Sequence, residues 1–314
     1  MSIEHKLGIK ASPTAVLQFG DHGGAVAHLI GQENRGLEYM FIMMNAARYA
    51  VGVQGIAIAE RAYQKAAAFA KERVQSRPVD GSLAGSGPII HHPDPEVRKQ
   101  NQAFYEFLVP LVKGYSTEMS IEVASLGVQV HGGMGFIEET GAAQYLRDAR
   151  ILTIYEGTTA IQANDLVGRK TARDGGRTAK AIAAQMAATQ AELARRDHVA
   201  ARAMLKQLTA GRAAFEQVVD FIAGNTKASP NAVFAGSVPY LMLAGNVVAG
   251  WQMARSMIVA LDQLGAGQGD AEFLRAKVAT AHFYAEHILN QAAATRDAIV
   301  DGADSVMALA QASF

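Results

Sequence analysis

The stretch from Gln129 to Gln162, QVHGGMGFIEETGAAQYLRDARILTIYEGTTAIQ, has the most distinctive pattern in this chain. A glycine turn, His131–Gly135, separates a long segment of helical spacing over residues 96–130 from a short one over Thr140–Asp148. Because the turn follows a helical pattern and not a strand, the pattern favours a tight helix–helix turn. A phosphate cradle built from backbone amides is the weaker alternative.

Outward from this stretch the chain is dominated by helix-forming residues from Gly36 onward. A loop rich in Gly, Pro and Ser is expected over Pro78–Pro95, and a second boundary near Arg173–Gly176. Further breaks are expected at residues 225–230 and 265–269. The expected helices span 37–73, 96–130, 140–148, 177–195, 198–224, 232–263 and 271–296. The fold class is therefore mainly α.

The N-terminal residues have a different character. Thr14–Phe19 is rich in β-forming residues, Asp21–Gly24 resembles a turn, and Ala25–Ile30 can pair back as a hairpin. Two strands alone are marginal in water, so we expect them to belong to a larger sheet whose other strands lie outside this chain or come from a partner.

Composition excludes several kinds of chemistry. The 314 residues contain 29 Lys and Arg, 29 Asp and Glu, and no cysteine. A formal charge of zero disfavours a nucleic-acid binder, and the lack of thiols excludes disulfides, thiolate zinc sites and cysteine nucleophiles. Chemistry must therefore depend on carboxylates, histidines or a bound cofactor.

No apolar run near the N-terminus resembles a signal peptide, so a cytoplasmic protein is expected. The uncharged window between Lys227 and Arg255 is long enough to span a bilayer. Pro230, Pro239 and Asn246 interrupt it, which favours a buried helix of a soluble protein over a membrane span.

Two ionisable residues are isolated in apolar surroundings. Arg48 is the single charged residue in Tyr39–Ala59, and Glu156 is the single charged residue in Ile151–Asn164. A buried arginine needs an anionic partner or ligand, and a desolvated carboxylate becomes a stronger base. The alternatives are that Arg48 reaches solvent at a rim and that Glu156 stabilises the start of a helix near Thr158.

Adjacent histidines at His91 and His92, with Asp94 nearby, also invite a metal interpretation. Neighbouring side chains in a loop converge poorly on one ion, and no further ligand of suitable spacing accompanies them. We expect an ordinary loop and no metal site.

The combination QVHGGMG and YLRDARI–x3–YEGT resembles the C-terminal signature of the acyl-CoA dehydrogenases. The region after Asp174 is similar to the extra helical tail of the longer bacterial members, a group that includes 3-methylmercaptopropionyl-CoA dehydrogenases. The resemblance implies three parts: residues 1–36 as a remnant of the middle β-domain, 37–173 as the catalytic helical bundle, and 174–314 as an additional helical domain. It also implies that one helix of the bundle is missing near Pro88–Asp94.

The same resemblance implies roles for particular residues. Glu156 matches the base that removes the α-proton of an acyl-CoA thioester while the β-hydrogen leaves as hydride to FAD, and Arg48 and Tyr155 match residues at the substrate. The positions that match contacts of FAD are Arg73, Gln129, Gly132, Gly133 and Thr158.

The implied reaction is α,β-dehydrogenation of an acyl-CoA, in fatty acid β-oxidation or of the 3-methylmercaptopropionyl-CoA type. The implied partners are further copies of the chain and an electron-transfer flavoprotein as acceptor. The alternative is a truncated, non-catalytic helical domain that dimerises and holds no FAD. Dimer and tetramer are both open.

Overall fold

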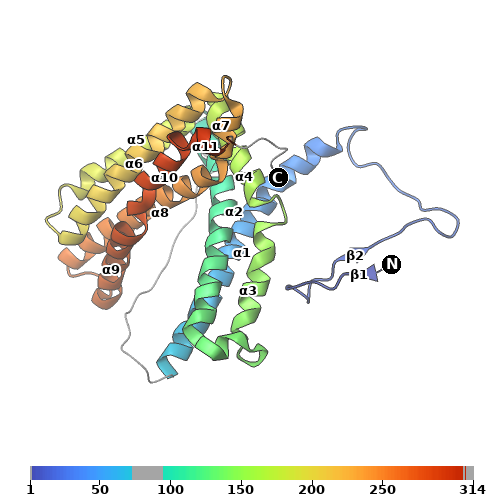
Figure 1. The fold of residues 1–314 in the computed structure, drawn as a ribbon, viewed down its shortest axis with the longest axis horizontal. Coiled ribbons are helices and arrows are strands. Elements are labelled where there is room, and N and C mark those ends of the chain that lie inside the picture. Colours follow the sequence, from blue (N-terminus) through green and yellow to red (C-terminus); the bar gives the residue numbers. More distant parts are fainter. Residues whose placement is uncertain (1, 73–94, 307, 309–314) are drawn as a thin grey trace. The chain divides into compact units, whose positions relative to one another are not determined.

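The computed structural model describes residues 2–72, 95–306 and 308, and these residues are almost entirely helical (Figure 1). The chain forms two compact units. Among the described residues, the first comprises residues 2–72 and 112–159, and the second comprises residues 95–111, 160–306 and 308. The mainly α fold predicted from the sequence is confirmed, whereas the three-part domain division stays a prediction.

In the first unit two long helices and one short helix lie side by side. They are α1 (Gly36–Glu72), the C-terminal part of α2 (Pro95–His131) and α3 (Ala142–Arg150). Short 3-10 turns connect them over Gly132–Phe136, Glu138–Thr140 and Ile151–Thr153. A small apolar core of Ala62, Ala124 and Ala149 joins the three helices. Because alanine side chains are small, the backbones can approach closely here.

The expected hairpin is wrong. Strand β2 (Ala15–Val16) pairs antiparallel with β1 (Ser2–Ile3), and residues 25–30 form no strand. Gly20, Gly23 and Gly24 all have positive φ, and the chain through this turn does not return along β2. Val26 and Ile30 stay 92% and 89% exposed, so the apolar pattern that suggested a second strand is not satisfied within the described residues.

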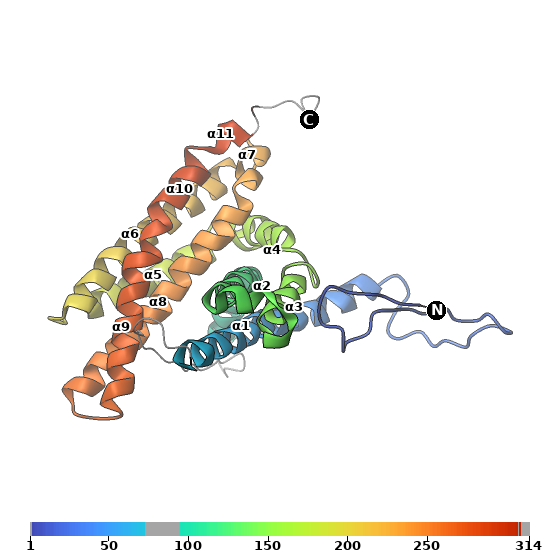
Figure 2. The same cartoon turned by 60° about the horizontal axis from the view of Figure 1, so that its bottom comes forward.

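The second unit is a helical bundle whose long helices lie alongside one another in both views (Figures 1 and 2). Its elements after α4 (Thr159–Asp165) and a π-helical turn (Leu166–Thr171) are α5 (Arg177–Leu193), α6 (Val199–Asn225), α7 (Pro230–Ala235), α8 (Ser237–Gly265), α9 (Ala271–His287), α10 (Ala292–Val300) and α11 (Ala303–Val306). The N-terminal part of α2 belongs to the same unit, where Phe107 packs edge-on against Phe215 of α6.

Two expected helices are each divided. The helix expected over 232–263 breaks at Gly236, between α7 and α8, and a Cβ there would lie 2.9 Å from Ile299. The helix expected over 271–296 breaks at Ile288–Gln291, where no Gly or Pro marks it. Gly211 of α6 and Gly250 of α8 leave a notch that the buried Leu289 side chain fills. A Cβ atom at Gly211 or Gly250 would lie only 3.1 or 2.8 Å from that side chain. Tertiary packing therefore sets this break.

The uncharged window considered for a membrane span lies mostly in α8, whose residues Tyr240, Leu241 and Ala244 are fully buried in the bundle. The interpretation as a buried helix is confirmed. In the part of the chain that the structure describes, the helix long and apolar enough to cross a membrane is instead the Gly36–Ala62 segment of α1. This property concerns length and composition alone.

Candidate active site

Glu156 lies on the short connection between the 3-10 turn Ile151–Thr153 and α4. Its backbone has φ +55°, and Gly157 follows with φ +94°. Glycine adopts this left-handed region freely, but a glutamate there carries a conformational cost. The side chain is half-buried and its Oε2 atom is fully buried. The most distinctive carboxylate of the sequence therefore lies on a strained turn.

Lys113 of α2 contacts this turn. Its side chain is 0% exposed, and its Nζ atom donates a hydrogen bond of 2.6 Å to the carbonyl oxygen of Gly157. Burial lowers the pKa of Lys113 to about 8, and the charge of Arg48 acts in the same direction. The carboxylates of Glu118 and Glu156 oppose this effect. Charged groups from α1, α2 and the turn therefore all act on Lys113.

Two more hydrogen bonds hold the same turn. The Tyr155 hydroxyl donates to Gln54 Oε1 of α1 at 2.6 Å, and the Thr159 hydroxyl donates to Glu118 Oε1 of α2. Burial raises the pKa of Tyr155, and the negative charge of Glu156 raises it further. Tyr155 is therefore a neutral hydrogen-bond donor next to the glutamate.

Arg48, the other isolated residue of the sequence, is 6% exposed on α1. Its charge affects Lys113, which makes it part of the same electrostatic group as Glu156. The structure therefore has Arg48, Tyr155 and Glu156 in one unit of the fold, and their roles stay a prediction. Arg73 and the segment with His91, His92 and Asp94 lie outside the described residues.

The glycine turn is the tight helix–helix turn that the pattern favoured. It continues α2 as a 3-10 helix over Gly132–Phe136. Gly132 has φ +59°, and a Cβ at Gly135 would lie 2.2 Å from the carbonyl oxygen of Val128. At Gly133, in contrast, an added Cβ would meet nothing within 4 Å. Gly135 is required by packing, whereas Gly133 faces open space.

The other residues expected to contact a cofactor are accessible. Gln129, Gly132, Gly133 and Thr158 are all exposed in this structure. They lie at the end of α2, in the 3-10 turn that follows it, and just before α4. The Gln129 side chain and the backbone of Gly132 and Gly133 are therefore accessible to a ligand.

Sequence reasoning missed Lys113, Glu118 and Gln54. The signal for Lys113 was present, because it is the single charged residue between Glu106 and Glu118 in FLVPLVKGYST. The same criterion of isolation had singled out Arg48 and Glu156. Gln54 and Glu118 carry no comparable signal, since their importance depends on which residues the fold places opposite them.

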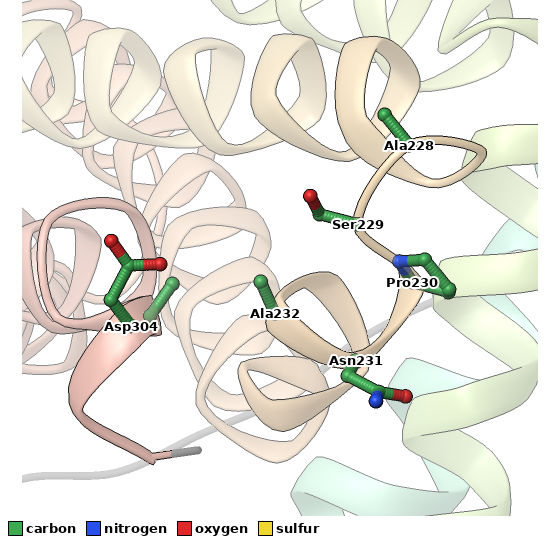
Figure 3. A pocket seen from close by; sticks show the side chains of 7 residues that line it. Ala228, Ser229, Pro230, Asn231, Ala232 and Asp304 are labelled. Carbon is green, nitrogen blue, oxygen red and sulfur yellow. The ribbon is translucent and has the colours of Figure 1, made fainter. Parts of the chain in front are cut away.

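A separate hollow of about 330 Å³ lies in the second unit, between the start of α7 and α11 (Figure 3). Ser229, Asn231 and Asp304 supply its polar side chains, and Ala228, Pro230 and Ala232 supply apolar ones. None of the predicted site residues lines it. Since its one ionisable group is a carboxylate, it is poorly suited to a phosphate-bearing ligand.

Comparison with protein families finds two matches. Residues 96–171 match the acyl-CoA dehydrogenase C-terminal domain, and residues 179–310 match a domain described as acetyl-CoA dehydrogenase C-terminal like. Together with the helical fold, these matches define the class of the chain as C-terminal helical domains of CoA-thioester dehydrogenases.

Individual relatives agree. The chain is 51% identical over 340 residues to a 3-methylmercaptopropionyl-CoA dehydrogenase of Ruegeria pomeroyi, covering 98% of this chain and 57% of the relative. It is 32% identical over 367 residues to the broad-specificity linear acyl-CoA dehydrogenase FadE5 of Mycobacterium tuberculosis, covering 100% of this chain and 59% of that one. The chain belongs to the acyl-CoA dehydrogenase family, and it spans less than two thirds of the length of these relatives.

Solved structures share the fold. An acyl-CoA dehydrogenase from Bacillus anthracis complexed with FAD matches with a TM-score of 0.63 at 19% identity, over 99% of this chain and 57% of that one. ACDH-11 of Caenorhabditis elegans in complex with C11-CoA matches with a TM-score of 0.69 at 17% identity, over 95% of this chain and 53% of that one.

The turn geometry gives a first prediction. Gly135→Ala will lower the free energy of unfolding by about 1–3 kcal/mol, because the new methyl group overlaps the Val128 carbonyl. Gly133→Ala, two residues away, is the matched control and will change it by less than about 0.5 kcal/mol. Urea denaturation followed by circular dichroism measures both. Equal effects of the two substitutions would show that the close approach at Gly135 does not constrain the turn.

Lys113 gives a prediction about pH. The pKa of Lys113 is about 8 in the folded protein, and in the unfolded chain it has the ordinary value of 10.5. Between pH 8 and 10.5 the unfolded chain therefore binds a proton that the folded chain does not. Stability contributed by this group therefore rises with pH, by at most about 1.4 kcal/mol per pH unit. Urea midpoints at pH 7, 8, 9 and 10 will show the wild-type chain gaining stability relative to Lys113→Met above pH 8. A constant difference would contradict the shift.

Proposed function

We propose that the chain acts in the flavin-dependent α,β-dehydrogenation of an acyl-CoA thioester to the enoyl-CoA, with Glu156 as the base. The observation that supports this most is the position of Glu156 on a left-handed turn, half-buried and bordered by Tyr155 and Gly157. Removal of an α-proton needs a carboxylate that is held in place and protected from water. The 51% identical relative supports an acyl-CoA of the 3-methylmercaptopropionyl type as the substrate. A broad-specificity linear acyl-CoA dehydrogenase and a butyryl-CoA dehydrogenase among the other relatives support linear acyl-CoAs, as in fatty acid β-oxidation.

Residues of this chain fit a flavin as cofactor. Gly133 presents open space where a Cβ would meet nothing, and exposed Gln129 and Thr158 offer polar side chains. We assign these residues, with Gly132, to contacts of FAD, and Arg73 to the same role by its place in the sequence. When bound, the flavin supplies the acceptor for the β-hydrogen as hydride, a step for which no protein side chain is suited.

The remaining steps belong to the protein. Glu156 accepts the α-proton at its carboxylate, and Tyr155, held by Gln54, packs beside it. Arg48, which is buried on α1, supplies positive charge near the site. We assign Arg48 and Tyr155 to the substrate side of the site.

We also propose a homo-oligomer that works in the cytoplasm and passes electrons to an electron-transfer flavoprotein. An apolar surface along α1 supports the oligomer: Ile42 and Met43 are 75% and 61% exposed within the single chain. Contiguous exposed apolar residues of this kind indicate a surface that another protein surface covers. The acceptor is proposed from family membership alone.

The decisive substitution is Glu156→Gln, which keeps the size of the side chain and removes its basicity. We expect dehydrogenation of 3-methylmercaptopropionyl-CoA or butyryl-CoA, measured with an artificial electron acceptor, to fall about 100-fold or more. The exposed Glu139→Gln is the matched control and will retain wild-type turnover. Full turnover by Glu156→Gln, with an unchanged circular dichroism spectrum, would rule out this base.

Flavin binding separates the proposal from a non-catalytic helical interaction domain. Titration of the purified chain with FAD will give a protein fraction with flavin absorbance after gel filtration. Gly133→Ala will weaken this binding because the added methyl group occupies the open approach, whereas Gly224→Ala, equally unhindered on α6, will not. A colourless protein that ignores FAD would favour the interaction domain.

A further inference from the structure

The turn at Glu156 has to be held against its own conformational preference. Glu156 and Gly157 are consecutive residues with positive φ. A non-glycine residue in this region costs of order 1–3 kcal/mol and persists only where the surroundings impose it. Since the orientation of the Glu156 side chain follows from its backbone, whatever holds the turn also aims the carboxylate.

Lys113 contacts the turn at the residue that follows the strained glutamate. Its Nζ atom donates to the carbonyl oxygen of Gly157 at 2.6 Å, one residue after Glu156. The bonds of Tyr155 and Thr159 flank the turn on either side. Lys113 is 0% exposed, so this hydrogen bond does not compete with water as that of a surface lysine does.

The charges around Lys113 explain why a buried ammonium is tolerated. Glu118 on its own helix and Glu156 on the turn favour its charged form, while Arg48 on α1 opposes it. These two carboxylates and two cations sum to no net charge. Lys113 therefore contacts the turn through its hydrogen bond and also interacts electrostatically with the Glu156 carboxylate.

We propose that Lys113 is a positioning residue for Glu156: its hydrogen bond to the Gly157 carbonyl fixes the left-handed turn and thereby the orientation of the catalytic carboxylate. This inference rests on the proposed function for its catalytic meaning. The positioning itself is a property of the folded chain and is measurable without activity.

The first test is amide hydrogen exchange of the full chain, followed by mass spectrometry. In Lys113→Met, which keeps the length of the side chain without its donor, exchange of the peptide covering Tyr155–Thr159 will accelerate at least tenfold. Lys113→Arg, which keeps a donor, will restore most of the protection. Lys170→Met is the matched control, because this substitution also removes a lysine charge and breaks a 3.1 Å ion pair, the one with Glu106 in the other unit.

Unchanged exchange at Tyr155–Thr159 in Lys113→Met would overturn the proposal. So would an equal acceleration throughout residues 112–159, because that result indicates general destabilisation and not release of one turn. If Lys113→Met does not fold, the carboxyl carbon of Glu156, observed by NMR in the wild-type chain, decides the question. Its chemical shift will change as Lys113, whose pKa is about 8, loses its proton, and this change will be absent in Lys113→Arg. The lack of such a change would contradict the proposal.

Kinetics then tests the catalytic meaning. With an acyl-CoA substrate, Lys113→Met will lower kcat about 10- to 100-fold while KM changes less than twofold, and Lys113→Arg will recover part of kcat. A change in KM as large as the change in kcat, or an unchanged kcat, would overturn the role of Lys113 in positioning the base. A wild-type chain that binds no FAD and turns over no acyl-CoA would instead overturn the proposed function, and the exchange result would still decide the positioning.

Discussion

The hydrogen bond from buried Lys113 to the Gly157 carbonyl is the interaction on which the candidate site depends. The turn it supports contains a glutamate with φ +55°, a conformation that local sequence alone disfavours. Contacts from two helices far apart in the sequence, α1 through Gln54 and α2 through Lys113 and Glu118, hold this turn. The placement of Glu156 is therefore a property of the helix pair and not of the connection that carries it.

The two compact units are stabilised in different ways. The first has a small alanine core and a group of mutually compensating charges around Lys113. The second is stabilised by large apolar side chains, with Phe107 and Tyr240 packing on Phe215. Buried charge contributes little net stability but constrains geometry, whereas apolar burial contributes stability with little directionality. The proposed chemistry lies in the unit whose interior is polar enough to orient a carboxylate.

The positions of most helices could be predicted from the sequence, because helical spacing and glycine or proline breaks are local signals. The bounds expected for the first two helices, 37–73 and 96–130, agree with α1 and α2 to within one residue at each end. The errors arose where distant contacts decide. No glycine or proline near Ile288 indicates the helix break at which Leu289 packs against Gly211 and Gly250. Strand β2 pairs with the N-terminal strand β1 and not with residues 25–30.

By itself the sequence determined which residue types stand alone in apolar surroundings, and this identified Arg48 and Glu156 and connected the chain to its family through the glycine turn and the YEGT motif. It determined the helical fold for the same reason, since periodicity is local. Only the tertiary structure decided that Lys113, Gln54 and Glu118 form hydrogen bonds with the turn around Glu156. It also decided that packing requires a glycine at position 135 and not at 133. Those facts depend on which surfaces meet when helices separated by many residues pack together, and a linear pattern contains no measure of that approach.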